Sequence, residues 1–250
     1  MNTHRKVPEV ALAFWVMKIC ATTLGETAGD LFSMTLKVGY AVSSIILVSA
    51  FVVSLASQLL SKHYRPPLYW MVILTTSTAG TTMSDYIDRT LGLGYAKGSA
   101  ILVGLLLCVL AAWWKSTGSL SVDRIDTRKG EIFYWVAILL SNTLGTALGD
   151  FLADSSGLGF VGGALLVGGA LAVVIGATLL TRISRVALFW IAFVLTRPLG
   201  ATVGDVLTKS KEKGGLDFGT VGSSAILLTI LVALVVWEMV KQKRARGEAH

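Results

Sequence analysis

Long apolar segments alternate with short polar ones along the whole chain. A helix that crosses the bilayer core, which is about 30 Å thick, needs about 20 predominantly apolar residues. Eight segments meet or approach this length, and we expect helices over Val10–Asp30, Ala41–Leu60, Leu68–Asp85, Ser99–Trp114, Ile132–Asp150, Val161–Leu180, Val186–Asp205 and Val221–Val240. The pattern predicts an all-α membrane protein with eight transmembrane helices and no separate soluble domain.

The first, third, fifth and seventh segments repeat one motif. In each of them an aspartate follows a tryptophan by fifteen residues, as Trp15/Asp30, Trp70/Asp85, Trp135/Asp150 and Trp190/Asp205. A glycine lies ten residues after each tryptophan, and a second glycine or a serine lies fourteen residues after it, so that each copy reads Gly-x-x-x-Gly/Ser-Asp. Because a fixed period indicates a repeated structural unit, we interpret each motif segment and the apolar segment after it as one helical hairpin.

The spacing between the copies adds a second level of organisation. Trp15 and Trp135 are separated by 120 residues, and so are Trp70 and Trp190. We therefore expect one integral membrane domain made of two pseudo-symmetric halves. Residues 1–120 would contain hairpins 1 and 2, and residues 121–250 would contain hairpins 3 and 4.

Polar residues gather on one face of each motif segment, because helix positions three and four apart share a face. The members of these faces include Lys18, Thr22, Glu26, Asp30, Ser77, Thr81, Asp85, Asn142, Thr146, Asp150, Arg197 and Asp205. Ionisable groups that face lipid cost roughly 2.5–3.5 kcal/mol each, so we expect these faces to turn inward. Gly-x-x-x-Gly spacing lets helix backbones approach closely. The four motif helices should therefore converge on one axis, surrounded by an apolar outer ring of the other four.

The composition agrees with a membrane protein and excludes several functional classes. Hydrophobic residues make up 54% of the 250 positions and the mean hydropathy is +0.70, above the range of soluble domains. The net charge of +7 comes from basic residues scattered over short loops, which does not fit nucleic-acid binding. No histidine (His4, His63, His250) lies in an expected span, which argues against haem. No nucleophile and base arrangement or phosphate-binding loop is apparent, so we expect no enzyme activity.

Loop charges predict the orientation of the chain. The side reached by the ends of the motif segments carries Lys37, Arg89, Lys97, Lys209, Lys211 and Lys213. The opposite side, which bears both termini, carries more lysines and arginines, and the positive-inside bias therefore places both termini in the cytoplasm. The first apolar segment leads into a polar motif and not into a signal-peptidase site, so we expect it to be retained. The expected location is the bacterial inner membrane.

The four copies differ in charge. Copies one and three carry a second acid four residues from the aspartate, Glu26 in copy one and Asp154 in copy three. Copies two and four instead carry a base four residues after it, Arg89 and Lys209, and such spacing favours a local ion pair. We predict that the uncompensated negative charge belongs to copies one and three, and that copies two and four are structural.

Carboxylates beside hydroxyl and amide oxygens suit hard cations, and carboxylates that interact can also carry protons. The sequence therefore predicts a cation transporter or channel. The predicted ion ligands are Glu26, Asp30, Asp150 and Asp154. The predicted pathway residues are Thr22, Thr23, Asp85, Asn142, Thr143, Thr146, Arg197 and Asp205. A bound cation is the one cofactor expected. The expected partners are lipid, the cation and protons, and a homo-oligomer is compatible with the sequence.

Two bases lie inside expected spans and leave alternatives open. Arg197 should lie near the midplane, either as the counter-ion of Glu26 or another acid, or as the binder of an anionic substrate. Lys18 is shallower and should extend to the cytoplasmic interface, where we also expect the four motif tryptophans as anchors. An anion or organic-acid transporter that uses Arg197 and Lys18 is the alternative function, and a non-transporting membrane scaffold is the third. The carboxylates could also be helix-terminal groups bonded to loop backbone.

The best-preserved motifs are Thr23 to Asp30, which reads TLGETAGD, and Thr143 to Asp150, which reads TLGTALGD. Four tandem two-helix units with this motif resemble the bacterial family of membrane-anchored proteins defined by a repeat of unknown function. The likeness covers almost the whole chain, although copy two has Ser84 in place of the second glycine. The resemblance implies eight helices and no known activity.

A second, fainter likeness concerns the acidic motif of copy one. The segment from Glu26 to Asp30 is similar to the Glu-x-Gly-Asp signature of a family of manganese and calcium/proton exchangers, with one residue more in the spacing. This resemblance implies that the cation is a divalent metal such as manganese, coupled to protons.

Overall fold

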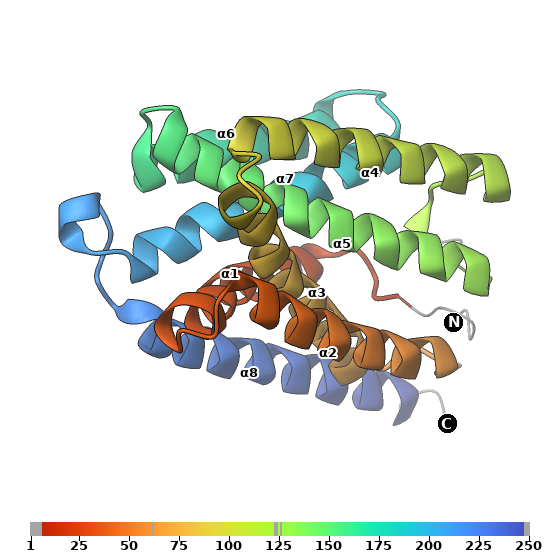
Figure 1. Ribbon diagram of the computed structural model, residues 1–250. Helices are drawn as coiled ribbons and strands as arrows, with labels where there is room; N and C mark the ends of the chain where they lie inside the picture. Colours follow the sequence, from red (N-terminus) through yellow and green to blue (C-terminus); the bar gives the residue numbers. More distant parts are fainter. Residues whose placement is uncertain (1–6, 62, 123–124, 126, 248–250) are drawn as a thin grey trace.

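The computed structural model describes residues 7–61, 63–122, 125 and 127–247. The described residues form α-helices joined by short turns, without strands (Figure 1). The helices are α1 (Leu12–Asp30), α2 (Tyr40–Leu60), α3 (Pro66–Asp85), α4 (Tyr95–Thr117), α5 (Arg128–Asp150), α6 (Gly159–Leu180), α7 (Arg185–Thr208) and α8 (Gly219–Gly247). Each lies where the apolar pattern predicted a helix. Two of the histidines considered above, His4 and His250, lie outside the described residues.

Three of the motif helices widen into a π-helical turn directly after their aspartate. These turns are η1 (Leu31–Thr35), η2 (Tyr86–Thr90) and η4 (Phe151–Ser155). Each ends in a hydrogen bond to a carbonyl five residues back, as from the Leu36 N–H to the Leu31 carbonyl at 2.9 Å. The fourth copy differs, because α7 ends at Thr208 and a short 3₁₀ helix, η5 (Lys211–Lys213), follows. Turns of π type are frequent at functional sites.

Six of the described helices are long and apolar enough to cross a membrane. These spans are Tyr40–Leu60, Tyr95–Thr117, Arg128–Ser155, Gly159–Leu180, Arg185–Thr208 and Gly219–Arg244. The two that fall short are the first two motif helices. Helix α1 contains Lys18, Glu26 and Asp30, and α3 is rich in threonine. Their polar side chains are buried inside the protein, so the residues that make these two helices less apolar lie in the interior.

The four motif helices form a closed ring in chain order. Helix α1 packs against α3, α3 against α5, α5 against α7, and α7 back against α1. In an apolar stretch of 18 residues within each helix, 67% is buried in α5 and 56% in α7, but only 17% in α6. The motif helices therefore make the interior, and the even-numbered helices present their apolar side chains outward, as the sequence predicted.

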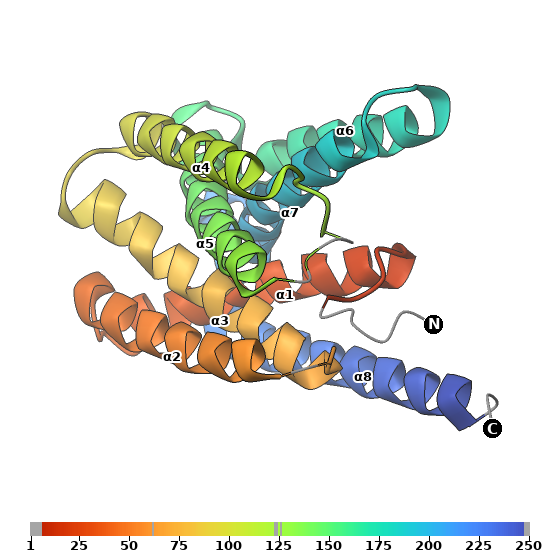
Figure 2. The same ribbon diagram turned by 90° about the vertical axis from the view of Figure 1, so that its right-hand side faces the viewer.

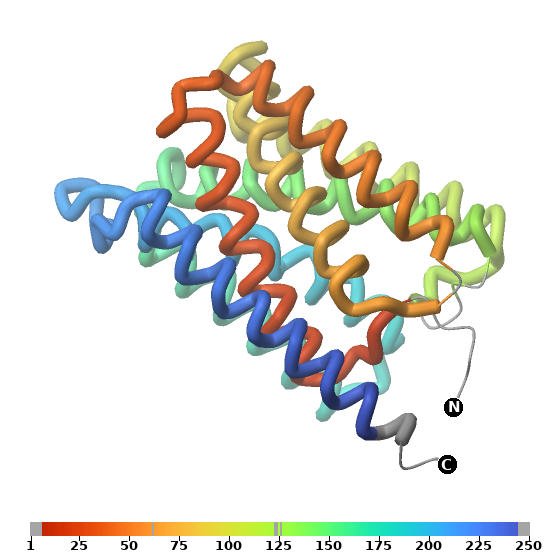
Figure 3. The backbone as a smooth tube through the Cα atoms, turned by 90° about the horizontal axis from the view of Figure 1, so that it is seen from below, coloured from red at the N-terminus to blue at the C-terminus, as the bar shows by residue number. Residues whose placement is uncertain are grey.

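The even-numbered helices show that the repeat does not pack as a hairpin. Helix α2 packs mainly against α3, α4 against α5, α6 against α7, and α8 against α1 (Figures 2 and 3). The main partner of each second helix is thus the first helix of the next unit. The prediction of four self-contained hairpins is wrong in this respect, because the glycine turns separate the two helices of a unit instead of pairing them.

Glycines set the distance between neighbouring motif helices. The glycine ten residues after each tryptophan faces the residue seven after the tryptophan of an adjacent helix in the ring. The four pairs are Gly25 with Ser77, Gly80 with Asn142, Gly145 with Arg197 and Gly200 with Thr22. A methyl group on any of these glycines would lie less than 3.0 Å from the Cβ atom of its partner. The Gly-x-x-x-Gly/Ser motif therefore brings the helix backbones together, as such motifs do in membranes.

The motif tryptophans close one end of the ring. Each is preceded by Phe or Tyr, and this aromatic residue contacts the tryptophan of the next motif helix. The four contacts are Phe14 with Trp70, Tyr69 with Trp135, Tyr134 with Trp190 and Phe189 with Trp15. Three of the four tryptophans are at most 5% exposed. The prediction that they anchor the protein at the interface is therefore wrong for these three, because they are buried against aromatic residues of neighbouring copies.

We expect Gly80→Ala to destabilise the protein by about 1–3 kcal/mol, the cost of overpacking a tight site. The added methyl group would meet the backbone of Asn142 and Thr143, which cannot move aside as a flexible side chain could. The matched control is Gly104→Ala on α4, where no atom lies within 4 Å of the added group. Thermal unfolding in detergent compares the two variants. Equal melting temperatures would contradict the role assigned to Gly80.

Candidate functional site

The four motif aspartates are buried at the end of the ring opposite the tryptophans. Asp30, Asp85, Asp150 and Asp205 are each at most 4% exposed. Asp30, Asp85 and Asp150 are the last residues of α1, α3 and α5, and Asp205 lies in the last turn of α7. The register of the repeat therefore gives them a common level. The sequence-based expectation that these acids turn inward is confirmed.

Two bases join these aspartates in pairs. The Arg89 side chain lies 3.0 Å from Asp85 through its Nε atom and 3.1 Å from Asp150 through Nη2. The Lys209 ammonium lies 3.1 Å from Asp205 and 2.9 Å from Asp30. Each base therefore binds the aspartate of its own copy and that of the next copy in the ring.

This pairing corrects the prediction that copies two and four only form local ion pairs. Their bases also neutralise Asp150 and Asp30, which belong to copies three and one. Burial alone would lower the pKa of Lys209, but the carboxylates of Asp205 and Asp30 raise it above its usual value. Its ammonium group therefore stays charged at neutral pH.

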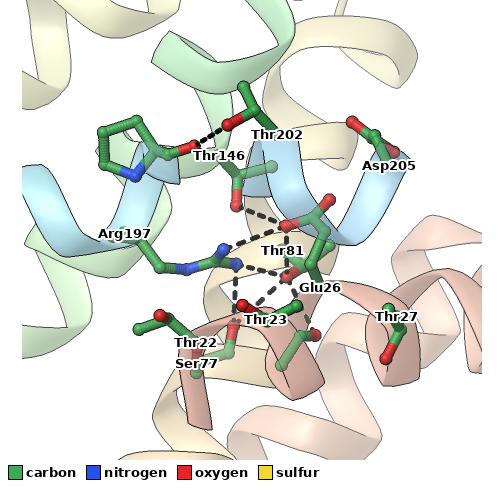
Figure 4. Close-up of polar contacts among 12 residues, drawn as sticks. Thr22, Thr23, Glu26, Thr27, Ser77, Thr81, Thr146, Arg197, Thr202 and Asp205 are labelled. Atoms are coloured by element: carbon green, nitrogen blue, oxygen red, sulfur yellow. Dashed lines mark hydrogen bonds and ion pairs between the residues drawn. The ribbon is translucent and has the colours of Figure 1, made fainter. Parts of the chain in front are cut away.

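A second ion pair lies deeper in the ring. The Arg197 guanidinium donates to the Glu26 carboxylate at 3.0 Å, and the side chains are 0% and 4% exposed (Figure 4). The other terminal nitrogen of Arg197 donates to the Thr81 hydroxyl at 2.5 Å and to the Ser77 carbonyl at 3.3 Å. Both of these residues lie on α3, which is opposite α7 in the ring. Arg197 therefore crosses the axis, and its predicted role as counter-ion of Glu26 is confirmed.

Threonines complete the environment of Glu26. One carboxylate oxygen of Glu26 accepts hydrogen bonds from Thr81 and Thr146, both at 3.3 Å, in addition to that from Arg197 (Figure 4). Helices α1, α3, α5 and α7 thus all contribute to one polar cluster. Thr81 was expected on the inward face but was not among the predicted site residues. Its position in the repeat could have indicated this role, since Thr81 and Thr146 follow their tryptophans by eleven residues, as Glu26 does.

The other predicted pathway hydroxyls have more local roles. The Thr22 hydroxyl donates to the Thr196 carbonyl of α7 at 3.2 Å and links two motif helices. Thr23 and Thr143 donate to carbonyls of their own helices, four residues back. Asn142 is fully buried, and neither the nitrogen nor the oxygen of its side-chain amide has a hydrogen-bond partner among the described residues.

Three carboxylates meet closely enough to share one ion. One carboxylate oxygen from each of Glu26, Asp30 and Asp205 lies within 4.8 Å of the other two, and all three residues are buried. Two of them were predicted ligands, and Asp205 was predicted as a pathway residue. The predicted ligand Asp150 belongs instead to the Arg89 pair. The predicted ligand Asp154 is exposed and accepts a hydrogen bond from the Tyr95 hydroxyl at 3.3 Å, so the structure places it outside this cluster.

Lys18 lies inside the ring and not at an interface. Its side chain is fully buried, and its ammonium lies 4.0 Å from the centroid of the Phe193 ring. The ammonium makes no hydrogen bond within the described residues. The prediction that Lys18 extends to the interface is wrong, because its inward-facing position directs the side chain onto α7.

Comparison with known proteins identifies the repeat. Residues 13–64, 68–119, 133–184 and 188–244 each match the family described as Repeat of Unknown Function (DUF347). Each match contains one motif helix and the helix that follows it, so the four copies inferred from the tryptophan spacing are confirmed. No curated protein and no solved structure matched the chain. Since the four matches cover most of its length, the chain belongs to the DUF347 repeat family and carries four copies of the repeat in tandem.

Proposed function

We propose that this protein is a multi-pass transporter of a divalent cation such as manganese in the bacterial inner membrane. Glu26, Asp30 and Asp205 would bind the cation during transport. The observation that carries this proposal is the meeting of their three buried carboxylates, with oxygens within 4.8 Å of one another. Buried carboxylates are costly in a membrane protein and mark ion pathways in transporters.

The three carboxylates offer hard oxygen ligands, which suit hard divalent cations. Ligands on opposite sides of a calcium-like ion lie about 4.6–5.2 Å apart. Oxygens that lie within 4.8 Å of one another can therefore bind one such ion together.

The proposal includes the membrane topology predicted from the sequence. All eight helices would span the bilayer, with α1 and α3 shielded by the six more apolar ones. Both termini would face the cytoplasm, where the tryptophan end of the ring would lie. Residues 1–120 and 121–250 would form two pseudo-symmetric halves. Two similar groups of one base between two aspartates, Asp85–Arg89–Asp150 and Asp205–Lys209–Asp30, support this pseudo-symmetry.

Proton coupling fits the same cluster. Carboxylates that lie close together change one another's proton affinity, so a cation that enters among them would favour loss of protons. The motif aspartates are linked in pairs by Arg89 and Lys209, and two of them, Asp30 and Asp205, adjoin Glu26. An inward flow of protons could therefore exchange for an outward flow of the cation.

We expect Asp30→Asn to reduce Mn²⁺ flux at least about tenfold, since losing a charged ligand in a buried site costs roughly 2–5 kcal/mol. The measurement is Mn²⁺ flux into proteoliposomes with an imposed pH gradient. The control is Asp154→Asn, which removes an exposed carboxylate outside the cluster and should leave flux unchanged. Transport at the wild-type rate in Asp30→Asn would refute the ligand assignment.

The Lys18 ammonium favours a second candidate function, the transport of an anion or organic acid. A buried ammonium without a hydrogen-bonding partner could hold an anion together with Arg197. A non-transporting scaffold remains the third hypothesis, and it predicts no flux of any ion.

Lys18→Met separates these functions. The Lys18 amine has no hydrogen-bonding partner among the described residues. Burying such a polar group costs free energy, so an apolar side chain of similar size should be neutral or stabilising there. For a cation transporter we therefore expect an unchanged or higher melting temperature and Mn²⁺ flux within about twofold of wild type. Chloride and acetate flux is measured in the same vesicles. Anion flux in the wild type that Lys18→Met abolishes would instead select the anion transporter.

A further inference from the structure

We propose that the Lys209 ammonium is a built-in competitor of the transported cation. The ammonium and the divalent ion would occupy the Asp30 and Asp205 carboxylates alternately, so that each ion expels Lys209 on entry and Lys209 helps to release it. This inference rests on the proposed cation site and adds a means of exchange to it.

The geometry already shows a cation held between two of the three carboxylates. The Lys209 Nζ atom lies 2.9 Å from Asp30 and 3.1 Å from Asp205. Asp30 ends α1 and Asp205 lies near the end of α7, so the ammonium joins the first and the last motif helix. A metal ion between the two aspartates would take the place of the ammonium and would compete with it for their carboxylates.

Arg89 provides the internal comparison, because it stands in the corresponding position of copy two. Its guanidinium binds Asp85, Asp150 and the Tyr40 hydroxyl, the last at 3.2 Å. It also lies over the rings of Tyr40 and Tyr95, at 5.9 and 5.8 Å. A planar guanidinium with several donors is fixed in this way, whereas an ammonium is a compact charge on a flexible stem. Arg89 is thus fixed by several contacts, whereas within the part of the chain that the structure describes the Lys209 ammonium binds these two carboxylates alone.

The segment after α7 holds the Lys209 backbone and leaves its side chain to move. The Lys209 carbonyl accepts a hydrogen bond from the Asp217 N–H at 3.0 Å, and the Phe218 N–H donates to Leu207 at the same distance. The segment therefore folds back on the end of α7. The Lys209 side chain is 24% exposed, in contrast to the buried aspartates that it binds. The side chain that carries the ammonium therefore reaches the protein surface, which the aspartates do not.

Charge balance favours replacement by a divalent ion. Three carboxylates, from Glu26, Asp30 and Asp205, share this region with the Arg197 guanidinium. With all four groups ionised, Lys209 compensates only half of the remaining negative charge, and a divalent cation compensates all of it. The Arg89 site has the same remaining charge, from Asp85 and Asp150. It lacks a third carboxylate, because the neutral Thr146 takes the place that corresponds to Glu26.

Lys209→Gln tests the competition, with Mn²⁺ as the probe and the purified full chain in lipid nanodiscs. Removing a close charge competitor should tighten Mn²⁺ binding by about tenfold or more, given the coupling energies of close charge pairs. The matched control, Arg89→Gln, should change the affinity by less than about twofold. Isothermal titration gives both affinities. Equal tightening in the two variants would overturn the inference, because it would indicate a general effect of charge.

A second variant keeps the test decisive if Lys209→Gln does not fold. Lys209→Arg retains the charge and can bind both aspartates through separate nitrogens, so Mn²⁺ binding should weaken about tenfold or more. Reductive methylation, located by mass spectrometry, adds a direct readout. Mn²⁺ should increase the labelling of Lys209 in the wild type and leave the exposed Lys97 unchanged. Unchanged Lys209 labelling at saturating Mn²⁺ would overturn the exchange.

The two proposals fail in different ways. If neither the wild type nor Lys209→Gln binds Mn²⁺, the cation site itself is refuted. If both bind it with equal affinity, the cation site stands and the role of Lys209 is refuted.

Discussion

The need to bury ionisable side chains together, inside an otherwise apolar set of helices, governs this structure. Helices α1 and α3 are too polar to cross a bilayer on their own composition, and burying charge without a partner costs several kcal/mol. The protein meets this need by turning the polar faces of four helices toward one another. Arg197 then binds Glu26 across the ring, and Arg89 and Lys209 bind the aspartates at its end.

The same contacts recur at each junction between copies. An aromatic residue meets the next tryptophan, a glycine receives a side chain of an adjacent helix, and in two copies a base reaches the next aspartate. The even-numbered helices cover these junctions, since each packs on the following unit. A repeat that makes most of its contacts with its neighbours has little stability by itself. The ring is therefore the smallest unit that satisfies every copy.

Much of this architecture could be predicted from the sequence. The apolar pattern gave the eight helices, and the Trp-to-Asp register placed Asp30, Asp85, Asp150 and Asp205 at one level. The ion-pair partners of individual side chains could not be predicted in the same way. Spacing of four residues predicts a bond between Lys209 and Asp205, but the second bond to Asp30 depends on which helices are neighbours. That neighbourhood is fixed by the ring and has no signature within a single copy.

The predictions for Lys18 and for three of the motif tryptophans were wrong for a related reason. Their residue types are common at membrane interfaces, and the sequence-based prediction relied on that preference. In the structure the tryptophans pack on aromatic residues of other copies, and Lys18 faces Phe193. The sequence did contain a signal of this packing, because a Phe or Tyr directly precedes the Trp in all four copies. An interface anchor requires no aromatic neighbour.

The packing of α8 on α1 has a consequence for biosynthesis. Chains leave the ribosome from the N-terminus, so the helix with Lys18, Glu26 and Asp30 is made before α7 and α8. The groups that neutralise two of these charges, Arg197 and Lys209, and the helix that covers α1 follow later. The two acids of α1 therefore stay without these partners until the fourth repeat has been made.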